Sequence, residues 1–122
     1  MNAPSKHSEK GYASFDVVVV PFPYADRLAE KRRPAVVISA PALERDCGTV
    51  WLVMVTSAEN RAWQGDVLVS NPAAAGLPAP SRIRPAKVAA VDADRIVHKI
   101  GVLPSKEAQA VQAQIKKFLG WS

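Results

Sequence analysis

The chain has 122 residues, 48 % of them hydrophobic and 22 % charged, which suits one globular domain with a single core and excludes a second. Sixteen Lys and Arg against eleven Asp and Glu give a formal charge of +5, which favours polyanionic partners such as nucleic acid. One cysteine excludes an intramolecular disulfide and fits a reducing cytoplasm. Because no apolar run approaches the roughly 20 residues that span a membrane, we expect a cytoplasmic protein without membrane contact.

The first residues differ in composition from the rest. Residues 1–13 are polar and carry no hydrophobic periodicity, so we expect a flexible N-terminal arm. From residue 14 the pattern changes, and we expect one domain over residues 14–122.

Short apolar, β-branched runs separated by Pro, Gly and polar residues predict strands. The run at 49–55 is apolar on both faces and should be the most buried of them. The polar stretch "ERDCGT", which holds Cys47, is typical of a loop. The predicted strands cover residues 15–20, 35–39, 49–55, 66–69, 81–84, 87–91 and 95–100.

The C-terminal stretch "PSKEAQAVQAQIKKFLG" has a different periodicity. Val111, Ile115, Phe118 and Leu119 fall on one face of a helix. Ser105 is a candidate N-cap, and a glycine after the last apolar residue can end the helix. The fold prediction is therefore mainly β with α: an antiparallel sheet or small barrel with a C-terminal amphipathic helix.

The common catalytic motifs are absent. The sequence has no Walker loop, G-x-G-x-x-G, H-E-x-x-H or paired C-x-x-C motif. One of its two histidines, His7, lies in the expected arm, and the other, His98, lies in a strand pattern where a surface position is the favoured interpretation. We therefore expect no metal site and no cofactor.

Cations and hydroxyl groups instead gather at predicted strand ends. Arg33 opens the second strand, and Thr56 and Ser57 close the third, so antiparallel pairing of these strands would bring the three together. A second cationic set follows on a later strand: Arg82, Arg84 and Lys87. Guanidinium and hydroxyl donors suit phosphate oxygens. Two interpretations stay open at this point, a phosphate site or solvated strand-end charges that resist edge aggregation.

Three stretches in the same order resemble the MazF/PemK family of toxins from type II toxin–antitoxin systems. The first is "DVVVVPFPYAD" followed by "KRRPAVVISAP", in which an Arg-Pro dipeptide heads an apolar strand. The second is "WLVMVTSAENR", with a Thr-Ser pair closing the strand, and the third is "SRIRPAKVAAVDADRI" with the C-terminal helix. The resemblance covers residues 14–120.

The resemblance implies an SH3-like or CcdB-like barrel that forms a homodimer. It also implies a sequence-specific, metal-independent endoribonuclease toxin that acts on single-stranded RNA, such as mRNA, and that a cognate antitoxin neutralises. The reaction would be attack of the 2′-hydroxyl on the adjacent phosphate, which leaves a 2′,3′-cyclic phosphate.

By the same resemblance, the catalytic residues fall on Arg33, Thr56 and Arg84. Because arginine has a pKa above about 12, it is a poor base, and we expect the two arginines to act as charge stabilisers and proton donor. Thr56 would hold a non-bridging oxygen. The residues expected to bind RNA are Lys31, Arg32, Ser57, Arg82 and Lys87.

Three positions depart from the family pattern. Phe15 replaces a glycine before the first-strand acid, Ala86 replaces an acid that some members carry, and Lys87 replaces a frequent glutamine. The change at Ala86 leaves an alternative open: a catalytically inactive CcdB-like binding protein, either a gyrase poison or a nucleic-acid-binding module.

Overall fold

The computed structural model describes residues 11–22 and 31–121, and in these ranges six strands form one sheet. The first ten residues of the expected arm lie outside them. The strands are β1 (Asp16–Phe22), β2 (Lys31–Val37), β3 (Thr49–Ser57), β4 (Val67–Leu68), β5 (Ser81–Asp92) and β6 (His98–Val102). The helices are α2 (Pro41–Cys47) and α3 (Ser105–Leu119), with short 3₁₀ turns η1 (Pro72–Ala75) and η2 (Ala93–Arg95).

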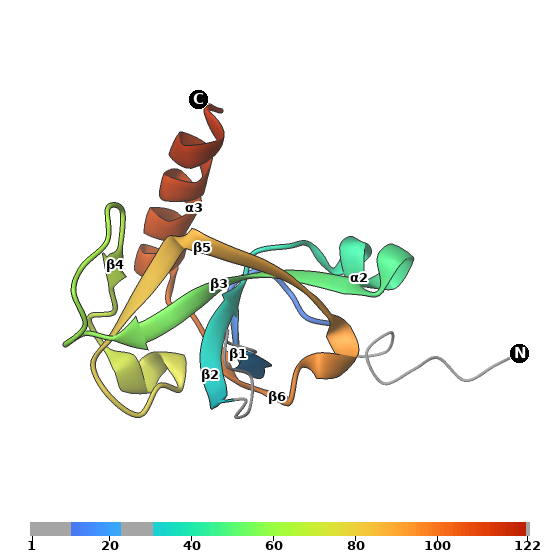
Figure 1. Cartoon of the computed structure of the whole chain (residues 1–122), viewed down its shortest axis with the longest axis horizontal. Coiled ribbons are helices and arrows are strands. Elements are labelled where there is room, and N and C mark those ends of the chain that lie inside the picture. Colours follow the sequence, from blue (N-terminus) through green and yellow to red (C-terminus); the bar gives the residue numbers. More distant parts are fainter. Residues whose placement is uncertain (1–10, 23–30, 122) are drawn as a thin grey trace, which may run out of the picture.

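The sheet has the order β4-β5-β3-β2-β1-β6, and all neighbouring strands are antiparallel. Figure 1 shows it curling into a half-barrel, with α3 standing on one side and α2 and η2 toward the other end. The predicted fold class, mainly β with a C-terminal helix, is confirmed. No helix in the described part of the chain has the length and apolarity needed to cross a membrane.

Side chains alternate between two apolar clusters on opposite faces of the sheet. The first cluster packs under α3 and includes Val17, Val36, Val53, Val55, Ile83, Ala108 and Val111. The second lies on the other face, next to η2, and includes Val18, Val20, Ala35, Val37, Leu52, Met54 and Ile96. The third strand is indeed buried on both faces over Leu52–Val55, while Trp51 and Ser57 are exposed.

Strand β2 starts four residues earlier than predicted. The polar run Lys31–Arg33, predicted as a loop, pairs with β1, where Arg33 lies opposite Val20. Pro34 lies opposite Val19, while pairing with β3 begins at Ala35. The proline, which has no N–H, therefore lies where β2 has only β1 as its ladder partner.

The two strands predicted at 81–84 and 87–91 form one twelve-residue strand, β5. Met54 lies opposite Arg84, but its neighbour Val53 lies opposite Val88, so three residues of β5 bulge out of the ladder. Pro85 lies in this bulge. Such bulges re-aim side chains and occur next to functional sites.

Helix α2 replaces the predicted loop around Cys47. Pro41 stands in its first turn, where a missing N–H costs nothing, and Gly48 ends it at a φ of 71°. Glu44 of this helix is buried and accepts a hydrogen bond from the Tyr12 backbone N–H at 2.9 Å. Burial raises the pKa of the Tyr12 phenol, and the carboxylates of Glu44 and Asp16 add to this effect.

Helix α3 is confirmed, with a different start. Ser105 is its first residue and does not cap it: Pro104 holds the cap position, without a side-chain hydrogen bond. Gly120 ends the helix at a φ of 76°, as expected. Of the predicted apolar face, Val111 is fully buried, whereas the last two apolar residues, Phe118 and Leu119, are about half exposed.

Glu107, in the first turn of α3, forms hydrogen bonds with Ser70, which follows β4. It accepts hydrogen bonds from the Ser70 backbone N–H at 3.0 Å and from the Ser70 hydroxyl at 2.7 Å. These two bonds lower the pKa of the buried carboxylate, although burial alone would raise it.

We expect Glu107→Gln to reduce the free energy of unfolding at pH 7 by about 1–2 kcal/mol, because hydrogen bonds to charged groups are the stronger ones. The folded-state pKa lies below the unfolded value of about 4.3, so the carboxylate's contribution is complete above that value and declines as the pH falls toward the folded-state pKa. Urea titrations of both proteins from pH 7 to pH 3 should show the difference shrinking below about pH 4.3. A difference that is constant with pH would contradict this assignment.

Candidate functional site

A small pocket of about 40 Å³ opens on the sheet face opposite α3. It is lined by Arg33, Met54, Val55, Thr56, Arg84 and Lys87. The structure thus brings together the three residues expected to be catalytic and one of those expected to bind RNA. The roles of these residues remain predictions.

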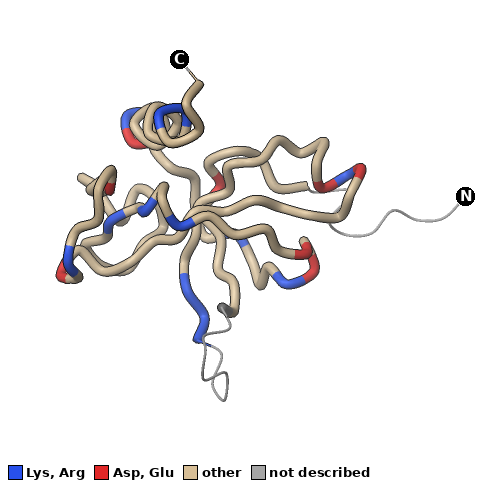
Figure 2. Tube along the Cα trace, turned by 45° about the horizontal axis from the view of Figure 1, so that its top comes forward, with Lys and Arg blue, Asp and Glu red and all other residues tan. Residues whose placement is uncertain are grey.

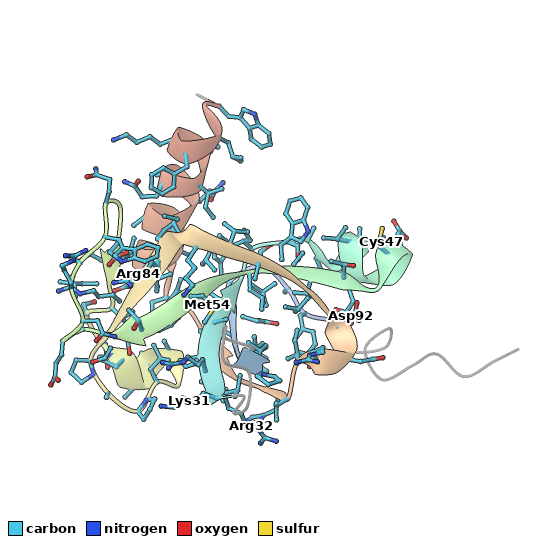
Figure 3. The ribbon with its side chains drawn as sticks, viewed as in Figure 1. Lys31, Arg32, Cys47, Met54, Arg84 and Asp92 are labelled. Carbon is cyan, nitrogen blue, oxygen red and sulfur yellow. The ribbon has the colours of Figure 1, made fainter. Side chains whose placement is uncertain are left out.

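The strand register places these side chains. Arg84 lies opposite Met54, and Ala35 lies opposite Met54 on its other side. Arg33 is two residues before Ala35 and Thr56 two residues after Met54, so all of them share one face. This face continues the second apolar cluster, which ends at Met54, and the polar site begins where the cluster stops. Figure 3 shows Met54 between Arg84 and the start of β2.

The guanidinium of Arg84 is held by the loop that follows β3. Its Nε lies 3.3 Å from both carboxylate oxygens of Asp66, and its Nη2 lies 3.2 Å from Asp66 Oδ2. Nη2 also donates to the Arg61 carbonyl at 2.6 Å. The side chains of this ion pair are 10 % and 3 % exposed, so the pair is shielded from solvent.

These bonds leave part of the Arg84 donor set available. Within residues 11–22 and 31–121, Nη1 makes no hydrogen bond. Because the fork of Nε and Nη2 is fixed by Asp66, the direction of Nη1 is fixed as well. The arrangement suits a rigid donor to an anion in the pocket that Arg84 lines.

Thr56 is oriented by its own loop. The Asn60 side-chain amide donates to Thr56 Oγ1 at 2.6 Å. With its oxygen accepting from Asn60, the hydroxyl retains its proton for donation to another acceptor. Thr56 can therefore offer a hydrogen bond to a phosphate oxygen in the pocket.

The other predicted RNA-binding residues do not line this pocket. Ser57 is exposed, points to the other face and accepts a hydrogen bond from the Glu59 N–H at 3.1 Å. Arg82 lies opposite Thr56, and its Nε donates to the Ala58 carbonyl at 3.2 Å. Lys31 and Arg32 are exposed at the start of β2.

Arg32 and Arg33 also line a second, larger pocket of about 330 Å³, with Val19, Pro34, Gly76, Pro78 and Ile100. Figure 2 shows the positions of lysine and arginine along β5 and at the start of β2. In Figure 3, Cys47 and Asp92 lie at the opposite end of the long axis from Arg84. The described cations of the candidate site therefore lie along β5 and at the start of β2, away from α2.

Three residues of the site were missed from the sequence: Asn60, Trp63 and Asp66. All lie in or next to the β3–β4 loop, and Asp66 was assigned to the fourth strand, which begins one residue later. The available signal was "WQGD", a turn sequence with one acid close to a basic cluster. In the described part of the chain, no three His, Cys, Asp or Glu side chains group closely enough to hold a metal ion.

Comparison with known families gives one match over most of the chain. Residues 13–119 match the model of the PemK-like, MazF-like toxin of type II toxin–antitoxin system. A comparison with curated protein sequences gives no match.

Solved structures with the same fold include an endoribonuclease in complex with its cognate antitoxin from a mycobacterial species. That match has 15 % sequence identity, covers 92 % of this chain and 98 % of the other, and has a TM-score of 0.73. A chain of the MazE–MazF complex from Deinococcus radiodurans matches at 21 % identity, 91 % and 97 % coverage and a TM-score of 0.71. The Mycobacterium tuberculosis toxin MazF-mt6 matches at 17 % identity, 88 % and 98 % coverage and a TM-score of 0.70. At these identities the likeness shows a shared fold.

Proposed function

Since this chain belongs to the PemK-like, MazF-like toxins of type II toxin–antitoxin systems, we propose that it is an endoribonuclease that cleaves single-stranded RNA. The observation that carries the proposal is the pocket that Arg33, Thr56, Arg84 and Lys87 line together. Structural neighbours that are themselves named endoribonucleases support it.

The proposed reaction uses the RNA's own 2′-hydroxyl as nucleophile. Its oxygen bonds to the adjacent phosphorus, the bond to the 5′-oxygen of the next nucleotide breaks, and the products are a 2′,3′-cyclic phosphate and a 5′-hydroxyl. The 2′-hydroxyl gives its proton to solvent water and the leaving oxygen gains a proton from Arg33, so the step consumes no water and needs no cofactor. DNA lacks the nucleophile, which restricts cleavage to RNA.

Arg33 is the proposed main stabiliser of the phosphorane-like transition state. Fixed guanidinium donors in a partly shielded pocket stabilise the extra negative charge more than water does. Arg33 is half-buried, and its backbone pairs with β1. The position of its backbone is therefore fixed before RNA binds. It also serves as proton donor toward the leaving oxygen, with solvent restoring the proton.

Thr56 and Arg84 are proposed to hold the non-bridging phosphate oxygens. The Thr56 hydroxyl proton and Arg84 Nη1 are the two donors whose geometry is set by Asn60 and Asp66 respectively. Lys87 adds positive charge at the pocket, and Lys31, Arg32 and Arg82 steer the RNA backbone toward it. Ser57 points to the other face. We therefore propose that it contacts only those nucleotides of the RNA that lie outside the pocket.

The proposed protein partners are a cognate antitoxin and a second copy of the chain. An acidic, partly disordered antitoxin segment would complement the cations at the start of β2 and along β5. Light scattering at micromolar concentration should report a homodimer, and a monomer would contradict this assignment.

The proposed function is tested with purified protein and several long single-stranded RNAs in EDTA. Fragments should appear with the wild-type protein, at sequence-defined positions, and addition of the cognate antitoxin should stop their formation. Intact RNA across varied sequences would overturn the proposal. Trapped gyrase–DNA complexes without RNA loss would instead support the CcdB-like alternative.

A further inference from the structure

Trp63 lies at the edge of the candidate pocket and is not part of either apolar cluster. The Arg84 guanidinium carbon lies 4.3 Å from the centre of its ring, and Lys87 Nζ lies 6.0 Å from the same point. Both cations line the pocket. The residue is nevertheless 42 % exposed, so the two cations do not cover all of the indole.

The backbone under this indole is fixed. The Trp63 N–H donates to Asp66 Oδ2 at 2.9 Å, and the Asp66 N–H donates to the Trp63 carbonyl at 3.1 Å. The same carboxylate holds Arg84, so one acid positions both the backbone of Trp63 and the guanidinium that lies against its indole.

The turn between Trp63 and Asp66 also packs closely against helix α3. Gly65 has a φ of +83°, and a Cβ added there would lie 2.7 Å from Gln114 Oε1 and 2.8 Å from Phe118 Cζ. The loop therefore approaches the helix more closely than another residue would permit. An exposed indole on a loop fixed at both sides needs little ordering when a ligand binds.

The other two tryptophans have different surroundings. Trp51 and Trp121 line an apolar groove beside α3, together with Phe15, Ile38, Ile115 and Leu119. Trp63 combines an exposed ring with the cations of the phosphate pocket, which is the combination that single-stranded nucleic acid sites use: a charged groove for the backbone and an aromatic face for a base.

We propose that Trp63 is a stacking platform for the base next to the cleaved phosphate. This inference rests on the proposed ribonuclease function and adds how the substrate is oriented. With the phosphate held by Arg33, Thr56 and Arg84, stacking on Trp63 fixes the direction in which the adjacent nucleotide leaves the pocket. Since every base has a π-face, the contact orients RNA without choosing its sequence.

The test measures binding of two uncleavable probes: a random-sequence pool of 2′-deoxy 10-mers, and an abasic 10-mer with the same phosphate backbone. Trp63→Ala should weaken binding of the base-containing pool by about 5- to 150-fold and leave binding of the abasic probe unchanged. Trp63→Phe should retain most of the affinity. Trp51→Ala, which removes a similarly exposed indole beside the other groove, should change neither.

A second readout does not depend on affinity. The double variant Trp51→Phe, Trp121→Phe leaves Trp63 as the one tryptophan of the chain. Its fluorescence should be quenched by the base-containing pool and not by the abasic probe. Equal loss of both probes in Trp63→Ala would mean that the indole acts only through Arg84, and no loss would mean that it contacts no base; either result overturns the inference.

RNA cleavage by the wild-type protein, measured in parallel, separates this inference from the proposed function. Base-dependent binding and quenching without cleavage would overturn the ribonuclease and leave Trp63 as the base contact of a binding protein. Cleavage together with unaltered binding by Trp63→Ala would overturn the stacking inference alone. If the wild-type protein neither cleaves RNA nor binds the probes, both fall.

Discussion

Replacing Arg33 by alanine is expected to slow RNA cleavage by about 100- to 1,000-fold, the effect of removing one donor aimed at a developing oxyanion. Arg33 lies on a strand paired with β1 and lines the pocket together with Thr56 and Arg84. Negative charge would accumulate in this pocket during the reaction. Because Arg33 is not part of either apolar cluster, the fold should persist. Cleavage rates and thermal unfolding of both proteins check this directly.

Arg32→Ala is the matched control. It removes the same charge from the neighbouring position, where the side chain is exposed. It should weaken RNA binding in a salt-dependent way and leave the rate at saturating RNA nearly unchanged. Arg33→Lys, which keeps the charge and loses the planar donor fork, should recover little activity. Equal losses in the Arg32 and Arg33 variants would show that the site uses bulk charge and no specific guanidinium.

Asp66→Ala is expected to reduce the free energy of unfolding by about 3–5 kcal/mol, because it leaves Arg84 buried without its counter-ion. The variant also removes the acceptor of the Trp63 N–H, so the β3–β4 loop loses its anchor. Chemical denaturation gives the free energy, and RNA cleavage should fall together with it.

The control for this variant is Asp46→Ala. Asp46 pairs with Arg45 at 3.6 Å, but these side chains are 68 % and 65 % exposed, so the loss should stay below about 1 kcal/mol. Adding Arg84→Met to Asp66→Ala should recover part of the stability, because the unpaired buried charge is then gone. Similar losses for the two aspartates would contradict a shielded Arg84–Asp66 pair.

The fold was largely predictable because apolar alternation is a local signal. The runs around Val17–Val20 and Val50–Val55 and the helical spacing from Val111 are read from neighbouring residues, and all became the expected elements. The start of β2 and the continuity of β5 were not predictable in this way. Residues 31–33 are extended because they pair with β1, and β5 stays continuous across Pro85 because a bulge takes the proline out of the ladder.

For the candidate site, the sequence predicted the meeting of Arg33 with Thr56, since antiparallel neighbours bring the start of one strand beside the end of the other. The link between Arg84 and Asp66 could not be predicted. It joins a strand to a loop 18 positions earlier, and its geometry depends on the turn at Gly65 against α3. Trp63 was missed for the same reason.

The most direct test of the central claim uses one RNA oligonucleotide that carries a cleavage position and its copy with a single 2′-deoxy substitution there. Mass spectrometry of the products after incubation in EDTA should show a 2′,3′-cyclic phosphate and a 5′-hydroxyl from the RNA, with the 2′-deoxy copy intact and the same products formed about 100- to 1,000-fold more slowly by the Arg33→Ala protein. Cleavage of the 2′-deoxy copy, or the same products at the same rate from Arg33→Ala, would contradict a pocket in which Arg33 stabilises attack by the 2′-hydroxyl.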